Sequence, residues 1–127
     1  MGQPDIKYGN MRKEFLDHIE NIVSLDKSFT LREHEPKVSK EMFEEVIHFV
    51  FDDTQLGKNP KNCIGIFLRD EYESIIVQNF VSLFDLLCNE YDENRPLKDI
   101  YIALNWKEMA ASANTILSKS LTDNYVV

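Results

Sequence analysis

The chain has 127 residues, of which 43% are hydrophobic, so it is long enough for one domain with a hydrophobic core and too short for two. Only 4 Gly and 4 Pro, beside 8 Phe and 5 Tyr, exclude collagen-like, low-complexity and disordered chains. The whole net charge of −8 arises in residues 41–127, since residues 1–40 carry equal numbers of acidic and basic side chains.

This charge balance narrows the classes of partner. Nucleic-acid binding needs cations that displace counterions from phosphates, and anionic membranes repel an acidic surface, so we expect neither partner. An acidic surface instead speeds encounter with a basic partner, although the same balance also serves solubility in many cytoplasmic proteins. No run of about 18 apolar residues and no apolar signal-peptide core is present, which predicts a cytoplasmic protein.

Helical periodicity dominates the first half of the chain. It predicts a helix from Asn10 to Leu25, followed by a connection over residues 26–38 that contains Pro36. A second helix is predicted from Ser39, as its N-cap, to Phe51, with its acidic residues near its positive end. These acidic residues are Glu41, Glu44 and Glu45.

The second half of the chain adds two more helices. Residues 64–68 are a short apolar run that fits a strand or a helical turn equally well. Asp70 and Glu73 form a capping-box pattern that starts the third helix, and the charged residues 90–96 end it. A short turn over 99–104 and a last helix from Asn105, fraying after Leu121, complete the chain. We therefore expect one all-α domain over residues 1–127, a bundle of four main helices with short extra helical turns and with residues 1–9 and 122–127 frayed.

One histidine and its neighbours form the only candidate for metal or acid–base chemistry. His48 and Asp52 are four residues apart and share a face if the helix extends that far, and Asp53 follows directly. Glu71 and Glu73 would join them if the intervening loop folds back. The alternative is that Asp52 and Asp53 end the helix through hydrogen bonds to the backbone. We therefore predict no metal, with His48, Asp52 and Asp53 as the ligands if one binds.

Nothing in the sequence resembles the motifs of nucleophilic catalysis or nucleotide binding. No serine lies in a nucleophile-elbow pattern, and Gly57 and Gly65 stand alone rather than in a phosphate-binding loop. Cys63 and Cys88 have neither metal-ligand nor disulfide spacing, and Cys88 fits a buried position on the third helix. We predict a protein that is not an enzyme and binds no cofactor.

Tyrosines flanked by acidic residues are the candidates for binding a protein partner. Tyr72, Tyr91 and Tyr101 are expected to be exposed, and Tyr91 stands among carboxylates that would steer a basic partner toward its ring. The alternative is a solvated loop tip with a half-buried tyrosine. The predicted partner-binding residues are Glu90, Tyr91, Asp92, Glu93, Glu71 and Tyr72.

An ordered series of residues in the middle of the chain resembles a protein family. It comprises the segment Ile47-His48-Phe49-Val50-Phe51-Asp52-Asp53-Thr54, then Leu56, Pro60, Ile64-Gly65, Leu68, Glu71, Glu73 and the late Trp106. Over residues 38–118 the chain resembles small acidic, largely uncharacterised bacterial proteins associated with the immunity repertoires of polymorphic toxin systems. The resemblance implies a bacterial immunity protein that binds a toxin.

The leading hypothesis is a non-catalytic antidote that masks a basic cognate toxin through an acidic helical surface. The first alternative is a small metal-dependent enzyme or metal-binding regulator that uses His48 and Asp52 or Asp53. The second is a self-associating module, since the second and third predicted helices are apolar on more than one side, which makes a homodimer credible.

Overall fold

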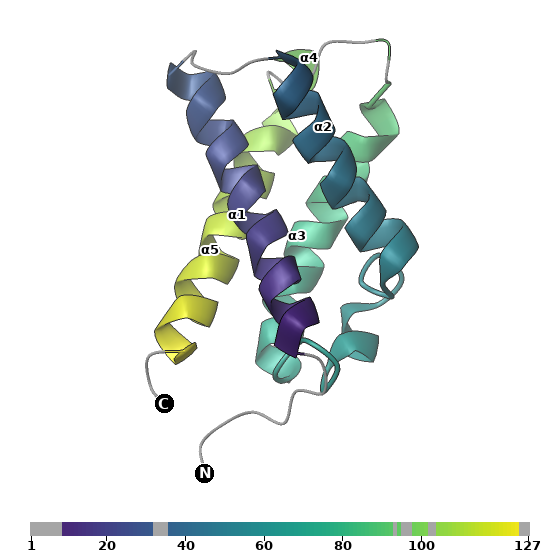
Figure 1. Cartoon of the computed structure of the whole chain (residues 1–127), viewed down its shortest axis with the longest axis vertical. Coiled ribbons are helices and arrows are strands. Elements are labelled where there is room, and N and C mark those ends of the chain that lie inside the picture. Colours follow the sequence, from purple (N-terminus) through teal and green to yellow (C-terminus); the bar gives the residue numbers. More distant parts are fainter. Residues whose placement is uncertain (1–8, 32–35, 93, 95–97, 102–103, 125–127) are drawn as a thin grey trace.

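The computed structural model describes residues 9–31, 36–92, 94, 98–101 and 104–124. Four long helices form a bundle, α1 (Gly9–Leu31), α2 (Pro36–Ile47), α3 (Glu71–Glu90) and α5 (Leu104–Asn124), and the start of α1 and the end of α5 lie at the same end of it (Figure 1). The described residues contain no strand. The expected all-α single-domain bundle is confirmed.

Three short elements complete the fold. A π-helix, η1 (His48–Asp53), continues α2, a 3-10 helix, η2 (Pro60–Cys63), precedes α3, and α4 (Lys98–Tyr101) precedes α5. Residues 64–68 form a turn closed by a single bridge between Ile64 and Leu68, with Gly65 at a φ of 83°. A glycine adopts this left-handed conformation without the steric cost that a side chain would add. The apolar run is therefore neither a regular strand nor a helix.

The first helix is longer than predicted. The sequence placed its end at Leu25, whereas α1 runs to Leu31 and includes Asp26. The indole N–H of the buried Trp106 donates a hydrogen bond to Asp26 at 2.8 Å, across 80 positions in the sequence. Because this contact joins distant parts of the chain, the local pattern, which places Asp26 in the connection, did not predict that the helix continues.

The predicted ends of the second helix were wrong at both sides. The helix α2 begins at Pro36, a position that proline favours because its fixed φ suits a first turn. Ser39 is therefore a buried residue inside the helix and does not act as its N-cap. Helical structure also continues past Phe51 as the π-helix to Asp53, after which Thr54 is extended.

The third helix begins as predicted, with the carboxylate of Asp70 accepting a hydrogen bond from the backbone N–H of Glu73 at 2.8 Å. The side chain of Glu73 does not return to its own cap, however. It accepts two hydrogen bonds from the Arg12 guanidinium, at 2.7 and 2.9 Å, and one from the backbone N–H of Arg69, at 2.9 Å. Arg12 also donates to the carbonyl of Phe67 at 2.8 Å, so this buried ion pair ties α1 to the loop before α3.

The ends of the bundle also differ from the expectation. The helix α1 already includes Gly9, and α5 begins at Leu104, so Asn105 lies inside the helix rather than before it. The helix α5 continues through residues 122–124, which were expected to fray. Among the described residues, no helix is both long enough and apolar enough to cross a bilayer.

The packing of the core differs between the two sides of α3. On one side α3 packs closely on α5, where the small buried side chains Ala110 and Ala113 let neighbouring helices approach. On the other side rings make the contact with α2 and η1: Phe43 of α2 lies 5.4 Å from Phe84 between centroids, and Phe51 of η1 is stacked on Phe84 at 6.1 Å. Large rings keep two helices farther apart than alanines do, which leaves room for a groove between α2 and the end of α3.

Candidate functional site

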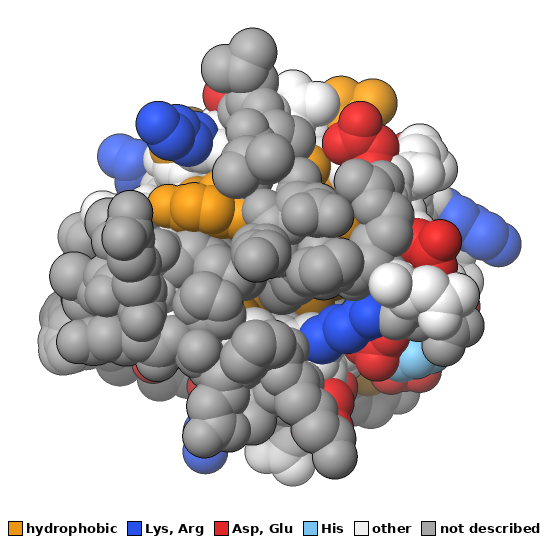
Figure 2. Space-filling view, turned by 90° about the horizontal axis from the view of Figure 1, so that it is seen from above, with side chains coloured by type: hydrophobic (Ala, Val, Ile, Leu, Met, Phe, Trp, Pro, Cys, Tyr) orange, Lys and Arg blue, Asp and Glu red, His pale blue; other side chains and the backbone are white. Residues whose placement is uncertain are grey.

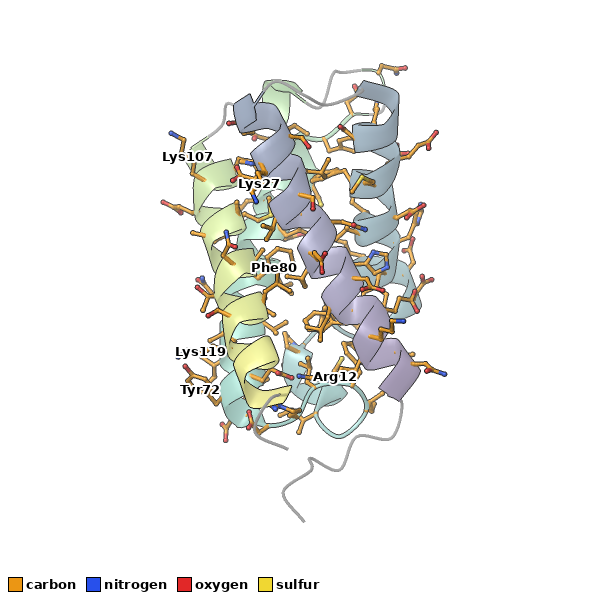
Figure 3. All side chains as sticks on the ribbon, turned by 60° about the vertical axis from the view of Figure 1, so that its left-hand side comes forward. Arg12, Lys27, Tyr72, Phe80, Lys107 and Lys119 are labelled. Atoms are coloured by element: carbon orange, nitrogen blue, oxygen red, sulfur yellow. The ribbon has the colours of Figure 1, made fainter. Side chains whose placement is uncertain are left out.

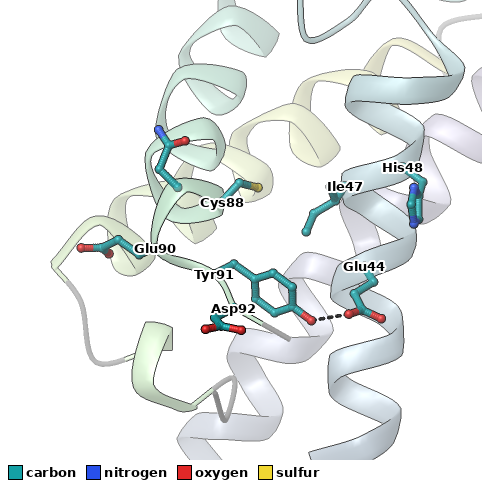
Figure 4. Close-up of a pocket in the computed structure, with 8 residues that line it drawn as sticks. Glu44, Ile47, His48, Cys88, Glu90, Tyr91 and Asp92 are labelled. Carbon is teal, nitrogen blue, oxygen red and sulfur yellow. Dashed lines mark hydrogen bonds between the residues drawn. The ribbon is translucent and has the colours of Figure 1, made fainter. Parts of the chain in front are cut away.

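An open groove lies between α2 and the C-terminal end of α3 (Figure 4). Its volume is about 860 Å³, and both polar and apolar side chains line it. The lining residues are Glu44, Ile47, His48, Cys88, Asn89, Glu90, Tyr91 and Asp92.

The α2 side of the groove follows from helical spacing. Lys40, Glu44 and His48 succeed one another at intervals of four residues and therefore share one face of the helix. Glu44 lies in the third turn of α2, because the helix starts at Pro36. It was assigned to the positive end of this helix, but the effect of the helix dipole falls off within the first turn. The position of Glu44 is therefore explained by the groove and not by the helix terminus.

Tyr91 closes the other side of the groove. It is the C-cap of α3 with extended backbone angles, and its N–H donates a hydrogen bond to the carbonyl of Cys88 at 3.1 Å. Its hydroxyl donates to the carboxylate of Glu44 at 2.5 Å, as the dashed line in Figure 4 shows. Its ring packs on Phe43 at 5.3 Å between centroids, and the ammonium of Lys40 lies over it at 5.8 Å. Tyr91 is thus half-buried and held in place from α2.

The acidic residues of the groove lie where negative charge is unfavourable for the helix. Glu90 and Asp92 lie at the C-terminal end of α3, where the helix dipole is negative, and the last turn of α3 carries no basic residue. Glu44 adds a third carboxylate from α2. Carboxylates at a helix C-terminus are unfavourable by a few tenths of a kcal/mol or more each, so these side chains make the potential at this end of α3 more negative.

His48 and Asp52 form the pair that their spacing predicted, with Nδ1 and Oδ2 2.7 Å apart. The hydrogen bond to Asp52, and then the charges of Asp52, Asp53 and Glu44, raise the pKa of His48 above its usual value of 6.5. Both side chains of the pair are more than 60% exposed. Figure 2, which views the molecule from above, shows acidic side chains beside a histidine side chain near the outline of the molecule.

A metal site would need more ligands than this pair. In the part of the chain that the structure describes, no group of three or more His, Cys, Asp or Glu side chains is arranged to hold a metal ion. Glu71 and Glu73 do not join His48, since Glu71 pairs with Lys61 at 3.6 Å and Glu73 with Arg12. The hypothesis of a site formed by His48, Asp52 and Asp53 thus gains no additional ligand from the fold.

The two cysteines stay protonated at neutral pH. Burial raises the pKa of the Cys63 thiol to about 11 and that of Cys88 to about 12. A thiol is a poor nucleophile and a poor metal ligand until it loses its proton. Cys88 therefore contributes an uncharged, weakly polar surface to the groove.

The structure brings only part of the predicted partner-binding set together. Glu90, Tyr91 and Asp92 line the groove, whereas Glu93 lies outside the described residues. Glu71 and Tyr72 lie at the opposite end of α3, about 28 Å away at about 1.5 Å per residue. Figure 3 shows Tyr72 at that end of the bundle.

The three tyrosines that were expected to be exposed differ in their surroundings. Tyr72 is 56% exposed, whereas Tyr91 and Tyr101 are half-buried. Tyr101 makes an edge-on contact with the Trp106 ring at 5.7 Å between centroids. Tyr72 also shares the outer surface of α3 with two exposed apolar side chains, Ile75 at 58% and Leu86 at 49%.

Four lining residues were not predicted as site residues, namely Glu44, Ile47, Cys88 and Asn89. The spacing of Lys40, Glu44 and His48 carried a signal, because it places three polar residues on one face of the helix, beside the buried apolar stripe of Phe43, Val46 and Val50. Nothing in the sequence indicated that Tyr91 would reach this face, because the contact spans 47 positions.

Comparison with known proteins gives one match. A family described as a domain of unknown function (DUF7945) matches residues 6–124, nearly the whole chain. No curated protein and no solved structure matches the chain. Because the match covers nearly the whole chain, the chain belongs to the DUF7945 family.

Proposed function

We propose that this protein is a non-catalytic binding module, an immunity-type antidote that masks a basic cognate toxin. The binding site is the groove between α2 and the end of α3. The resemblance of residues 38–118 to proteins associated with toxin immunity supports a toxin as the partner. The acidic side chains that line the groove support a partner with a basic surface.

The observation that carries the proposal is the position of Glu44, Glu90 and Asp92 around one open groove at the negative end of a helix. A sequence selected only for stability would place cations there. Local rules of stability are broken most often where a protein has a functional site. A basic partner would relieve the repulsion among these carboxylates, so binding and relief of unfavourable charge would occur together.

The mechanism is stoichiometric masking. A toxin that acts on phosphates must present a basic surface to bind them, and the acidic groove would occupy that surface and exclude the substrate. Charges at the rim of an interface act mainly on the association rate and on its salt dependence. We therefore expect association to slow as the salt concentration rises, because the Debye length shrinks to about 8 Å at 0.15 M.

The proposal is tested by capture followed by a toxicity assay. The tagged protein is used to capture partners from a lysate of its source, in parallel with a groove variant that carries Glu44→Gln, Glu90→Gln and Asp92→Asn. We expect one basic protein in stoichiometric amount with the wild type and little of it with the variant. Expressed alone, that protein is expected to be toxic, and co-expression of the wild type is expected to restore growth.

A matched control separates the groove from overall charge. The variant Glu20→Gln, Glu71→Gln, Glu108→Gln removes the same number of charges from exposed positions that do not line the groove. Equal capture by the wild type and the groove variant, or a captured partner that is not toxic, would contradict the proposal.

Self-association is a second candidate, favoured by the three large apolar side chains exposed on the outer face of α3, Tyr72, Ile75 and Leu86. Residues 74–84 carry no charge, so two copies could meet there despite a net charge of −8. Sedimentation equilibrium tests this. A dimer that the variant Ile75→Asp converts to a monomer would support self-association, and a monomeric wild type would refute it.

A further inference from the structure

We propose that the groove binds an arginine side chain of the partner, with its guanidinium on the ring of Tyr91 in the place that Lys40 now occupies. This inference rests on the proposed function and specifies the chemical group that the groove recognises. Three features carry it: a cation already seated on the ring, carboxylates with spare capacity to accept hydrogen bonds, and an uncharged surface beside them.

The first feature is a cation that belongs to the chain itself. The Lys40 ammonium lies over the Tyr91 ring at 5.8 Å from the centroid, within the distance at which a ring attracts a cation. The ring is positioned by Phe43 on one side and by the hydrogen bond from its hydroxyl to Glu44. Lys40 also shares a helix face with Glu44, so the ring and this carboxylate together place a positive charge over Tyr91.

The second feature is the capacity of the carboxylates. Glu44 accepts one hydrogen bond from Tyr91, and Asp92 accepts one from the backbone N–H of Asn94 at 2.9 Å. An ionised carboxylate offers about four acceptor positions, so each can accept more. A guanidinium has five N–H donors in a planar fork and can serve carboxylates on both walls of the groove at once. An ammonium is a more strongly hydrated point charge and gains less from this arrangement.

The third feature is the surface between the two walls. Ile47 from α2 and Cys88 from α3, whose thiol is uncharged, line the groove together with the acidic residues. The methylene groups of a long basic side chain bury themselves against such a surface while the charged end stays among polar groups. The groove therefore offers separate surroundings for the stem and for the head of an arginine.

Lys40 acts in this account as a placeholder. It partly offsets the negative potential of the groove in the unbound protein, and an incoming guanidinium takes its position on the ring. Removing the charge of Lys40 should therefore tighten the binding of a cationic ligand. We expect a gain of about three- to fivefold, the factor that Coulomb's law gives for two unit charges a few ångströms apart in water.

The test uses a short capped peptide in which arginine alternates with alanine, measured by calorimetry at low salt. Two comparison peptides are measured in the same way. In one, citrulline replaces arginine, which keeps the shape of the side chain and removes its charge; in the other, lysine replaces arginine. The arginine peptide is expected to bind at least tenfold tighter than the citrulline peptide and tighter than the lysine peptide. Lys40→Gln should tighten the binding of the arginine peptide. Lys107→Gln, which is the same change at an exposed site on α5 (Figure 3), should leave its affinity unchanged. Glu44→Gln should weaken binding, whereas Glu108→Gln should not.

Each outcome decides the inference separately from the proposed function. Equal affinity for the arginine and citrulline peptides would overturn the arginine site, as would equal effects of Lys40→Gln and Lys107→Gln. If the wild type captures a basic toxin through the groove but does not bind the arginine peptide, the function holds and the arginine site fails. If it binds the peptide in the groove and captures no toxin, the arginine site holds and the antidote function fails.

Discussion

Replacing Glu73 with glutamine should destabilise the bundle more than any other change of one carboxylate to its amide among the described residues. The side chains of Arg12 and Glu73 are 9% and 4% exposed and joined by two hydrogen bonds, and Glu73 also accepts the backbone N–H of Arg69. The glutamine keeps the shape but leaves the guanidinium charge uncompensated in a dry site. Breaking a buried pair in this way costs about 3 to 5 kcal/mol.

This cost is large compared with a typical total stability of about 5 to 15 kcal/mol. For 127 residues, an unfolding entropy of about 2.1 cal/mol/K per residue converts the loss into a Tm lower by roughly 11 to 19 °C. The assay is thermal unfolding followed by circular dichroism, with Glu108→Gln on the exposed face of α5 as the control. The double variant Arg12→Met, Glu73→Leu should recover part of the loss, because it removes the uncompensated charge of Arg12. The recovery should be incomplete, because the Arg69 side chain, 11% exposed and 3.7 Å from Glu73, still loses that carboxylate. A Tm for Glu73→Gln within 2 °C of the control would refute the reasoning.

Three further predictions concern the core and the rim of the groove. Gly57→Ala should lower the free energy of unfolding by about 1 to 3 kcal/mol, measured by urea unfolding, because the added Cβ would lie 2.4 Å from the Phe51 ring. An unchanged urea midpoint would contradict this prediction. Asp26→Ala should lower the free energy of unfolding by about 1 to 3 kcal/mol in the same assay, because the buried indole N–H of Trp106 loses its acceptor. An unchanged free energy of unfolding would contradict this prediction. The pKa of His48, measured by NMR titration, should lie above 6.5. Because folding raises this pKa, the contribution of His48 to stability is complete below pH 6.5 and is lost as the pH rises through the folded-state pKa. A measured pKa at or below 6.5 would contradict the prediction.

The sequence predicted those elements whose signals are local. The start of α3 was predicted because Asp70 caps a backbone N–H only three residues away. The pair of His48 and Asp52 was predicted for the same reason, since one helical turn separates the two residues. In both cases the interacting groups lie within one turn of the chain, so the pattern of residues contains the contact.

The features that the sequence did not predict depend on contacts between distant segments. Local patterns assign Glu73 to a capping box, but its carboxylate binds Arg12, which lies 61 positions away. They place Asp26 in the connection over residues 26–38, but it lies inside α1, where its carboxylate accepts a hydrogen bond from the indole of Trp106. Tyr91 was identified as a candidate anchor, but its reach to Glu44, which creates one wall of the groove, follows only from the packing of α2 beside α3.

The most direct test of the groove as the binding site is the affinity of the captured basic partner for three forms of the protein. These are the wild type, the groove variant (Glu44→Gln, Glu90→Gln, Asp92→Asn) and the charge-matched control (Glu20→Gln, Glu71→Gln, Glu108→Gln), all measured by calorimetry at 0.15 M salt. At roughly 0.7 kcal/mol for each removed charge, the groove variant should bind about thirtyfold more weakly, whereas the control should stay within about threefold of the wild type. Equal losses in the two variants would show that net charge alone attracts the partner, and a loss confined to the control would place the binding site elsewhere on the bundle.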